Sequence, residues 1–169
     1  MITKFKTTIL IISFCLLNVH SLASNKIPNT VFASVLRIVD GDTVYLKHNE
    51  YGKIKVRLAE IDTPEKDQPY GKEAALALSK LISGKIVKLN KVTVDKYNRI
   101  VGIIYYKKTD INYYLVRNGF AWSYDRYNRR KKIKDAENIA RKEKIGLWSK
   151  QGVPPIPPWE WRKMSKTNE

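Results

Sequence analysis

Cysteine is scarce in this sequence, and so are long apolar runs. The single cysteine, Cys15, lies within an apolar run at residues 7–19, so a framework of intrachain disulfides is excluded. That run is about a dozen residues long, whereas a membrane-spanning helix needs roughly 20. No internal repeat is visible. We therefore expect neither a disulfide-stabilised scaffold, nor a transmembrane protein, nor a repeat protein.

The first 23 residues have the composition of a signal peptide. Two lysines precede the apolar run, and Ser21 and Ala23 supply small residues at the cleavage positions. We expect residues 1–23 to be removed on export, the alternative being an uncleaved N-terminal anchor. The mature protein would then be secreted or periplasmic, a monomer, with no stable membrane insertion. About 146 residues would remain, which suits one domain stabilised by its core alone.

Acidic residues are also few, with 16 against 32 basic residues and a net charge of +16. Such a balance favours polyanionic partners, namely DNA, RNA or an anionic membrane face, although a basic surface kept for solubility is the plain alternative. The acids that do occur are clustered. Three carboxylates and one arginine lie within residues 56–65, and Asp40 and Asp42 lie shortly upstream. This pattern favours a cation site that faces a bound phosphate.

Hydrophobic periodicity predicts a mainly β fold of the α+β class. We expect strands at residues 31–39, 43–46, 54–58, 86–89 and 100–106, and helices at 70–83, 110–116 and around 133–140. Five short strands with inserted helices predict a five-stranded barrel of the oligonucleotide-binding (OB) type with three packed helices. Residues 24–30 would be an N-terminal extension, 31–150 the domain, and 151–169 a tail.

The tail is rich in proline and tryptophan. Four prolines and two tryptophans fall within residues 153–161, which argues against a helix and against a central strand there. We expect the segment to pack along the domain or to act as a linker, and a role as a ligand for a partner protein is the alternative.

Asp42 and Asp62 are the predicted metal ligands. Asp42 opens the second strand and Asp62 ends the third, so a meander would bring their carboxylates together at the barrel rim. Calcium takes about six to eight oxygens, so the carbonyl of Thr63, water and a substrate phosphate would have to complete the shell. The alternative for each aspartate is a structural role in a turn.

Arg57 and Arg99 lie near strand ends and are candidates for binding a phosphate. A guanidinium presents a planar fork of donors that fits a phosphate group. Glu65 follows Pro64 and would act on a metal-bound water, either as general base or by orienting it. An ordinary ion pair, a solvated turn and a loop carboxylate are the corresponding structural alternatives.

Six motifs in order connect these residues to a known family. They are DGDT at 40–43, RLAEIDTPE at 57–65, YGKEA at 70–74, DKYNR at 95–99, LVRNGFA at 115–121 and ARKEKIGLW at 140–148. Together they span nearly the whole mature domain. The chain resembles the staphylococcal (thermonuclease-type) nuclease family.

The resemblance implies an OB-fold barrel and calcium-dependent cleavage of DNA and RNA that leaves 3′-phosphate ends. Asp42, Asp62 and the carbonyl of Thr63 would bind Ca²⁺, while Arg57 and Arg99 would bind the phosphate and Glu65 would act on the attacking water. Glu60 is left with a structural role. Substrate-binding residues would be Lys96, Tyr97 and Tyr127.

Two departures from the family concern substrate contacts. The first tyrosine of the family's second nucleotide-binding pair falls on Asp125, with Tyr124 adjacent, and the loop at residues 66–69 is short. The expected function is a sugar-nonspecific nuclease. The alternatives are an OB module that binds nucleic acid without cutting it, and a basic exported protein that binds an anionic envelope surface.

Overall fold

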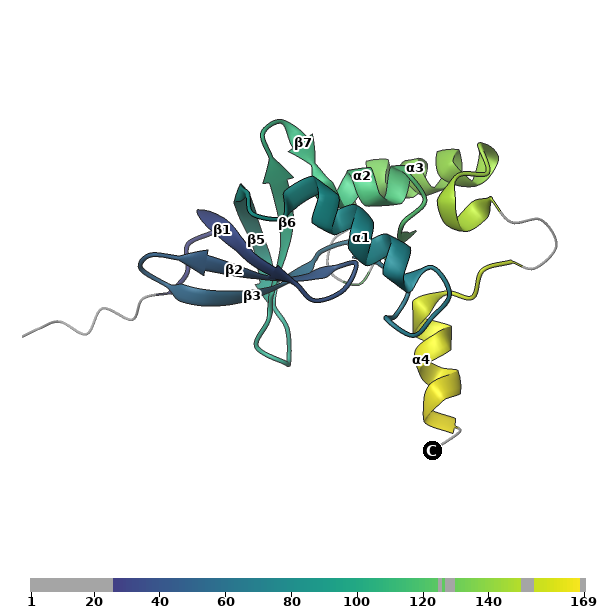
Figure 1. The fold of residues 1–169 in the computed structure, drawn as a ribbon, viewed down its shortest axis with the longest axis horizontal. Coiled ribbons are helices and arrows are strands. Elements are labelled where there is room, and N and C mark those ends of the chain that lie inside the picture. The colour runs from purple at the N-terminus through teal and green to yellow at the C-terminus, as the bar shows by residue number, and fades with distance from the viewer. Residues whose placement is uncertain (1–25, 125, 127–129, 150–153, 168–169) are drawn as a thin grey trace, which may run out of the picture.

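The computed structural model describes residues 26–124, 126, 130–149 and 154–167 (Figure 1). Its five long strands are β1 (Thr30–Ile38), β2 (Thr43–His48), β3 (Gly52–Leu58), β5 (Ile86–Val94) and β6 (Ile100–Tyr106). They lie in the order β3-β2-β1-β5-β6, each antiparallel to its neighbours. Strand β3 also pairs in parallel with β6, which closes the sheet into a barrel. The predicted five-stranded, mainly β fold is confirmed.

The helices within these ranges are α1 (Gly71–Ile82), α2 (Ile111–Arg117), α3 (Lys131–Lys142), α4 (Pro158–Thr167) and the 3₁₀ turn η1 (Gly146–Trp148). Short strands complete the chain: β4 (Ile61–Asp62), β7 (Thr109–Asp110) and β8 (Trp122–Ser123). Figure 1 shows the barrel at one end of the molecule, α2 and α3 at the other, and α4 extending away from both. Among the helices described, none has the length and apolar character that crossing a membrane requires.

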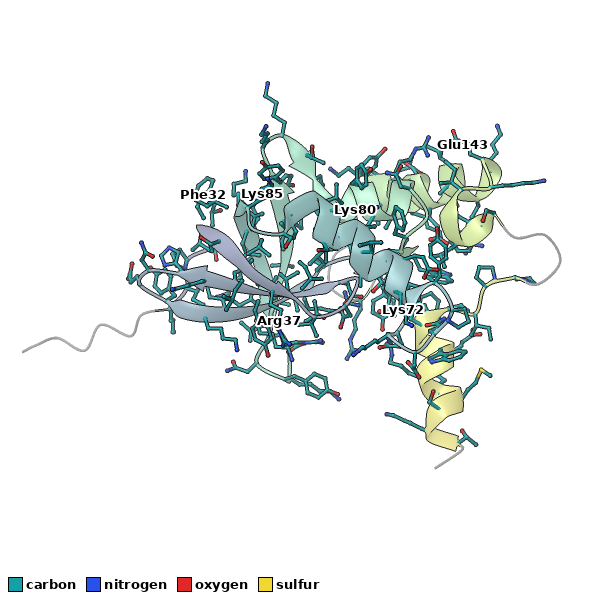
Figure 2. All side chains as sticks on the ribbon, viewed as in Figure 1. Phe32, Arg37, Lys72, Lys80, Lys85 and Glu143 are labelled. Atoms are coloured by element: carbon teal, nitrogen blue, oxygen red, sulfur yellow. The ribbon has the colours of Figure 1, made fainter. Side chains whose placement is uncertain are left out.

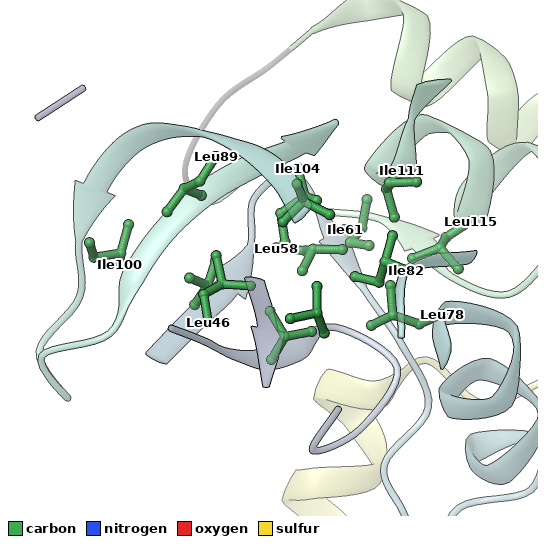
Figure 3. Close-up of a cluster of buried hydrophobic side chains, with 14 of the residues drawn as sticks. Leu46, Leu58, Ile61, Leu78, Ile82, Leu89, Ile100, Ile104, Ile111 and Leu115 are labelled. Carbon is green, nitrogen blue, oxygen red and sulfur yellow. The ribbon is translucent and has the colours of Figure 1, made fainter. Parts of the chain in front are cut away.

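The hydrophobic core fills the barrel and continues under the helices. Alternate residues of β2 and β3 face inward, and Leu46 and Leu58 are completely buried. Helix α1 adds Leu78 and Ile82, and α2 adds Leu115 (Figure 3). Because burying each such side chain stabilises the fold by about 1.5–3 kcal/mol, this core is what holds together a chain that has no pair of cysteines.

A buried amide fixes helix α2 to the barrel next to the end of β3. Asn112 is 0% exposed, and its Nδ2 donates to the carbonyl of Ala59 at 2.8 Å. Its Oδ1 accepts from the backbone N–H of Ile104 at 3.0 Å. Because both ends of the amide are satisfied, the burial costs little, and the chain is held in place where it leaves β3.

The chain turns sharply between β3 and β4. Glu60 has φ 67°, a left-handed conformation that is uncommon outside glycine. Its buried carboxylate accepts from Nε of Arg130 at 2.5 Å, which gives Glu60 the structural role predicted for it. The expectation that Asp62 ends the third strand is wrong, because β3 stops at Leu58 and the turn starts a separate strand, β4, which pairs with β8.

The C-terminal tail becomes helical at Pro158, so the expectation that residues 153–161 hold no helix is wrong for residues 158–161. Proline is tolerated at the first position of a helix, where its missing N–H is not needed and its fixed φ is suitable. Before the helix, the carbonyl of Ile156 accepts from Nε2 of Gln68 at 2.7 Å. Trp159 stacks on Tyr124 with ring centroids 5.6 Å apart. These contacts pack the tail against the domain.

Candidate active site

The turn before β2 presents Asp42 to Thr63. A side chain at Gly41 would meet Oγ1 of Thr63 at 2.7 Å, so only glycine allows this close approach. Asp42 is 6% exposed, and its Oδ2 accepts from both the backbone N–H and the hydroxyl of Thr63, each at 3.0 Å. The turn that follows β4 is therefore joined directly to the turn that precedes β2.

Arg57 lies between the two aspartates. It is 7% exposed, and its Nη2 contacts Asp62 Oδ1 at 2.7 Å and Asp42 Oδ2 at 3.1 Å. Its Nη1 donates to the carbonyls of Leu58 and Ile61, at 2.7 and 2.8 Å. The planar guanidinium thus fixes the turn between β3 and β4 and keeps both carboxylates at one point.

Glu65 lies beyond the rigid Pro64, on the open side of Asp62. Its backbone N–H donates to Oε1 of Gln68 at 3.0 Å. Its side chain is 36% exposed and contacts the guanidinium of Arg162. A carboxylate placed in this way, about one-third exposed and linked through Arg162 to the buried Asp62, is suited to accept a proton from water.

Arg99 comes from the turn between β5 and β6. Asp95 organises that turn, because its Oδ1 accepts from the backbone N–H groups of Tyr97 and Arg99, both at 2.9 Å. Its Oδ2 accepts from Nε of Arg99 at 2.7 Å. Burial opposes the ionised form of Asp95, but these hydrogen bonds outweigh it and hold its pKa below the usual value. An ionised Asp95 therefore orients Arg99.

One cavity of about 310 Å³ collects most of the predicted site. The predicted residues that line it are Asp42, Arg57, Asp62, Thr63, Glu65, Tyr97 and Arg99. Lys96 lies on the exposed turn beside it, with Nζ 5.0 Å from the ring centroid of Tyr97, and does not line the cavity. Tyr127 lies outside the described residues.

Four more residues line the cavity, namely Asp40, Tyr124, Arg126 and Arg162. Asp40 belongs to the acid cluster seen in the sequence, whereas the other three are not among the predicted site residues. Tyr124 is next to Asp125, the position where the family has a tyrosine. This neighbourhood is the feature of the sequence that points to Tyr124. Arg162 comes from α4, at the far end of the chain, and its sequence neighbourhood gave no sign of a site.

Asp42 affects the ionisation of two other acids that line the cavity, Asp40 and Asp62. Burial, and then the charge of Asp42, raises the pKa of Asp40 to about 6. Burial also raises the pKa of Asp62, with a contribution from Asp42, against the lowering effect of Arg162 and Arg57. These carboxylates are crowded, and a bound cation would relieve the repulsion between them.

The donor set fits a hard divalent cation with an incomplete protein shell. Asp42 and Asp62 contact the same nitrogen of Arg57, so their carboxylates lie side by side, and all the donors are oxygens. Within the described ranges, no group of three or more His, Cys, Asp or Glu side chains is arranged to hold a metal. Water and substrate would therefore have to supply the other ligands.

A family model described as "Staphylococcal nuclease homologue" matches residues 55–150. The chain belongs to the staphylococcal nuclease family. An "Uncharacterized endonuclease" of Haemophilus influenzae is 38% identical over 165 residues, covering 98% of this chain and 88% of that protein. An "Uncharacterized endonuclease" of Escherichia coli is 37% identical over 133 residues, covering 78% and 85%. A "Micrococcal nuclease" of Shigella flexneri is 36% identical over 143 residues, covering 78% and 80%.

Family membership indicates the class of reaction that this protein catalyses. The protein is a nuclease, a phosphodiester hydrolase whose substrates are nucleic acids. The residues that line the cavity include the acids and arginines of the family's motifs, namely Asp42, Arg57, Asp62, Glu65 and Arg99. We therefore take this cavity as the candidate active site.

Proposed function

We propose that this nuclease is calcium-dependent and sugar-nonspecific, and that it hydrolyses DNA and RNA to leave 3′-phosphate ends. The observation that carries the proposal is the cavity itself, where Asp42 and Asp62 lie against Arg57 and where Arg99 lines the same space. Carboxylates are good ligands for a hard cation, and guanidinium groups are good donors to a phosphate. A phosphodiester could therefore contact both the cation and the arginines.

The acids would hold the ion and the arginines would hold the substrate. Asp42, Asp62 and the carbonyl of Thr63 would bind Ca²⁺. When bound, the ion would stabilise the negative charge on the phosphate oxygens. Arg57 and Arg99 would bind the same phosphate through their guanidinium donors. Stabilising the charge that develops on the phosphate is the largest contribution expected from such groups.

Glu65 would accept a proton from the attacking water. As the water oxygen forms its bond to phosphorus, the bond from phosphorus to the 5′ oxygen breaks. The 5′ oxygen leaves and takes up a proton from solvent water, so the products are a 3′-phosphate and a 5′-hydroxyl. The placement of Glu65, about one-third exposed and linked through Arg162 to Asp62, supports this role.

The groups that line the cavity support the proposed lack of sugar and base specificity. The charged groups would bind phosphate, which every nucleotide carries. Contacts to phosphate convey no sequence information. Tyr97 is 68% exposed at the rim, where its ring is available to stack on any base. We further propose export to the periplasm or the medium, as the N-terminal sequence indicates, and a monomeric state.

A metal and substrate panel tests the proposal. The purified mature protein is incubated with plasmid DNA and with RNA in Ca²⁺, in Mg²⁺ and in chelator, and the product ends are labelled. We expect both polymers to be degraded in Ca²⁺ and protected by chelator, and the products to need phosphatase treatment before a 3′ end can be extended. Binding without cleavage in Ca²⁺ would favour the non-catalytic OB module instead.

A basic strip continues from the active site along the barrel, and we define it as Arg37, Tyr45, Lys53 and Lys55. Residues two apart on a strand share a face, so Lys53 and Lys55 lie on the same face of β3 as Arg57. Around the Tyr45 ring centroid, Lys53 Nζ lies at 4.1 Å, Arg37 Cζ at 5.2 Å and Lys55 Nζ at 5.8 Å. An aromatic ring among cations suits a single nucleic-acid strand.

Neutralising this strip is expected to weaken the binding of long substrates. Lys53→Gln combined with Lys55→Gln would remove two phosphate contacts, which should reduce the magnitude of the slope of log affinity against log salt by about 1.4 for a single strand. Cleavage of a dinucleotide should be unchanged. Lys80→Gln with Lys85→Gln, two exposed lysines at the end of α1 (Figure 2), is the matched control. Equal salt slopes for both double variants would contradict the proposal that the basic strip binds the substrate.

A further inference from the structure

Helix α4 places an arginine inside the active site. Arg162 Nη2 contacts Asp62 Oδ2 at 2.7 Å, and its Nη1 contacts Glu65 Oε1 at 2.5 Å and Asp62 Oδ1 at 3.3 Å. The guanidinium therefore bridges a predicted metal ligand and the predicted water-handling carboxylate. None of the roles assigned above uses this residue.

The position of Arg162 is set by two uncharged attachments on either side of the start of α4. Gln68 donates to the carbonyl of Ile156, and the same side chain accepts from the backbone N–H of Glu65. Trp159 stacks on Tyr124, which itself lines the active-site cavity. Because these contacts already fix the tail, the charge of Arg162 is not needed merely to attach it.

Arg162 uses the oxygens that an ion would need. Both oxygens of Asp62 accept hydrogen bonds from guanidinium groups, Oδ1 from Arg57 and Arg162, and Oδ2 from Arg162. Oδ1 accepts two of these hydrogen bonds and Oδ2 one, so a divalent cation bound to Asp62 would either share Oδ2 with Arg162 or displace a guanidinium donor. Two positive groups this close also repel each other in a partly buried site, where solvent screens them less.

We infer that Arg162 holds Asp62 and Glu65 through its guanidinium and competes with the metal ion for Asp62. It thereby sets the metal affinity of the enzyme and keeps Glu65 engaged until an ion is bound. Arg162 is a positioning residue in this scheme, because it acts through Asp62 and Glu65. The inference rests on the metal dependence proposed above.

Calorimetric titration of Ca²⁺ into the whole mature protein tests this competition without measuring activity. Arg162→Ala should bind Ca²⁺ more tightly than the wild type by roughly tenfold, which lies within the usual range of coupling between interacting binding events. Arg162→Lys, which keeps the charge but lacks the planar fork, should fall between them. Lys163→Ala, the exposed neighbour on α4, is the matched control and should keep the wild-type affinity.

A second variant guards against a trivial effect of Arg162→Ala on folding. Trp159→Ala loosens α4 without changing any charge, and it should also tighten Ca²⁺ binding, with the circular dichroism spectrum showing that the barrel is intact. Equal or weaker Ca²⁺ binding by Arg162→Ala and Trp159→Ala would overturn the inference and leave the proposed function standing. Undetectable Ca²⁺ binding by the wild type and every variant would contradict both.

Discussion

Arg57→Lys is expected to abolish most of the nuclease activity. The lysine keeps one positive charge, but it has no fork that can contact Asp42 and Asp62 while also donating to the carbonyls of Leu58 and Ile61. Removal of one such preorganised donor costs about 10²–10³-fold in kcat. In this site Asp42 and Asp62 would also lose the guanidinium that holds them together. Single-turnover cleavage of a short DNA substrate at saturating Ca²⁺ is the measurement.

The matched control for that substitution is Arg37→Lys. Arg37 is an exposed strand arginine of the basic strip, so the exchange retains its charge where no fork is required. Its turnover of a short substrate should stay close to that of the wild type. If Arg57→Lys cuts short DNA as fast as Arg37→Lys does, Arg57 neither binds the phosphate nor organises the acids.

Arg130→Met should cause a large loss of stability. Arg130 pairs with the buried carboxylate of Glu60 and also contacts Asp110 Oδ2 at 2.5 Å. Removal of one partner from a buried ion pair costs about 3–5 kcal/mol, and the lower end applies here because Arg130 is partly open to water. The free energy of unfolding in urea is the quantity to compare. Arg117→Met, which breaks a half-exposed pair with Glu143, is the control and should cost less than about 1 kcal/mol.

The same ion pair gives the stability a defined pH dependence. Burial opposes ionisation of Asp110, but hydrogen bonds from Arg130 and Lys132 outweigh it and lower the pKa of that carboxyl. A lowered pKa in the folded state means that the stabilisation is complete above the unfolded pKa, about 3.9. It is lost as the pH falls through the lower, folded value. The difference between wild type and Arg130→Met should thus be constant near neutral pH and shrink in acid, and a constant difference down to pH 3 would argue against it.

Much of the active site is predictable because short connections fix it. The hairpin after β2 sets a register in which Thr43 pairs with Arg57, so Asp42 must lie near Arg57. Strand β6 closes the barrel with Val101 opposite Arg57, which brings the preceding turn and its Arg99 to the same rim. The hydrophobic pattern shows the local spacing, and the number and order of the strands predict the barrel, so the grouping follows from both.

Long-range side-chain contacts could not be predicted in this way. Glu60 and Arg130 are far apart in sequence, and the residues around them do not specify their pairing. The prolines of the tail predict no helix because proline breaks a helix interior, whereas Pro158 starts a helix that has Glu160 in its first turn. A proline followed by an acid in the first turn is the sequence feature that could have predicted α4. Without α4, the contact between Arg162 and Asp62 could not be predicted either.

Cleavage by Glu65→Gln is the measurement that tests the central claim most directly, namely that hydrolysis takes place in this cavity. Glutamine keeps the size of the side chain but cannot accept the proton, and the partial exposure of Glu65 means that folding should be unaffected. We expect turnover of DNA in Ca²⁺ to fall by about 10²–10⁴-fold, the usual contribution of general base catalysis. Binding of the substrate should remain at the wild-type level. Wild-type turnover by a folded Glu65→Gln enzyme would contradict the account.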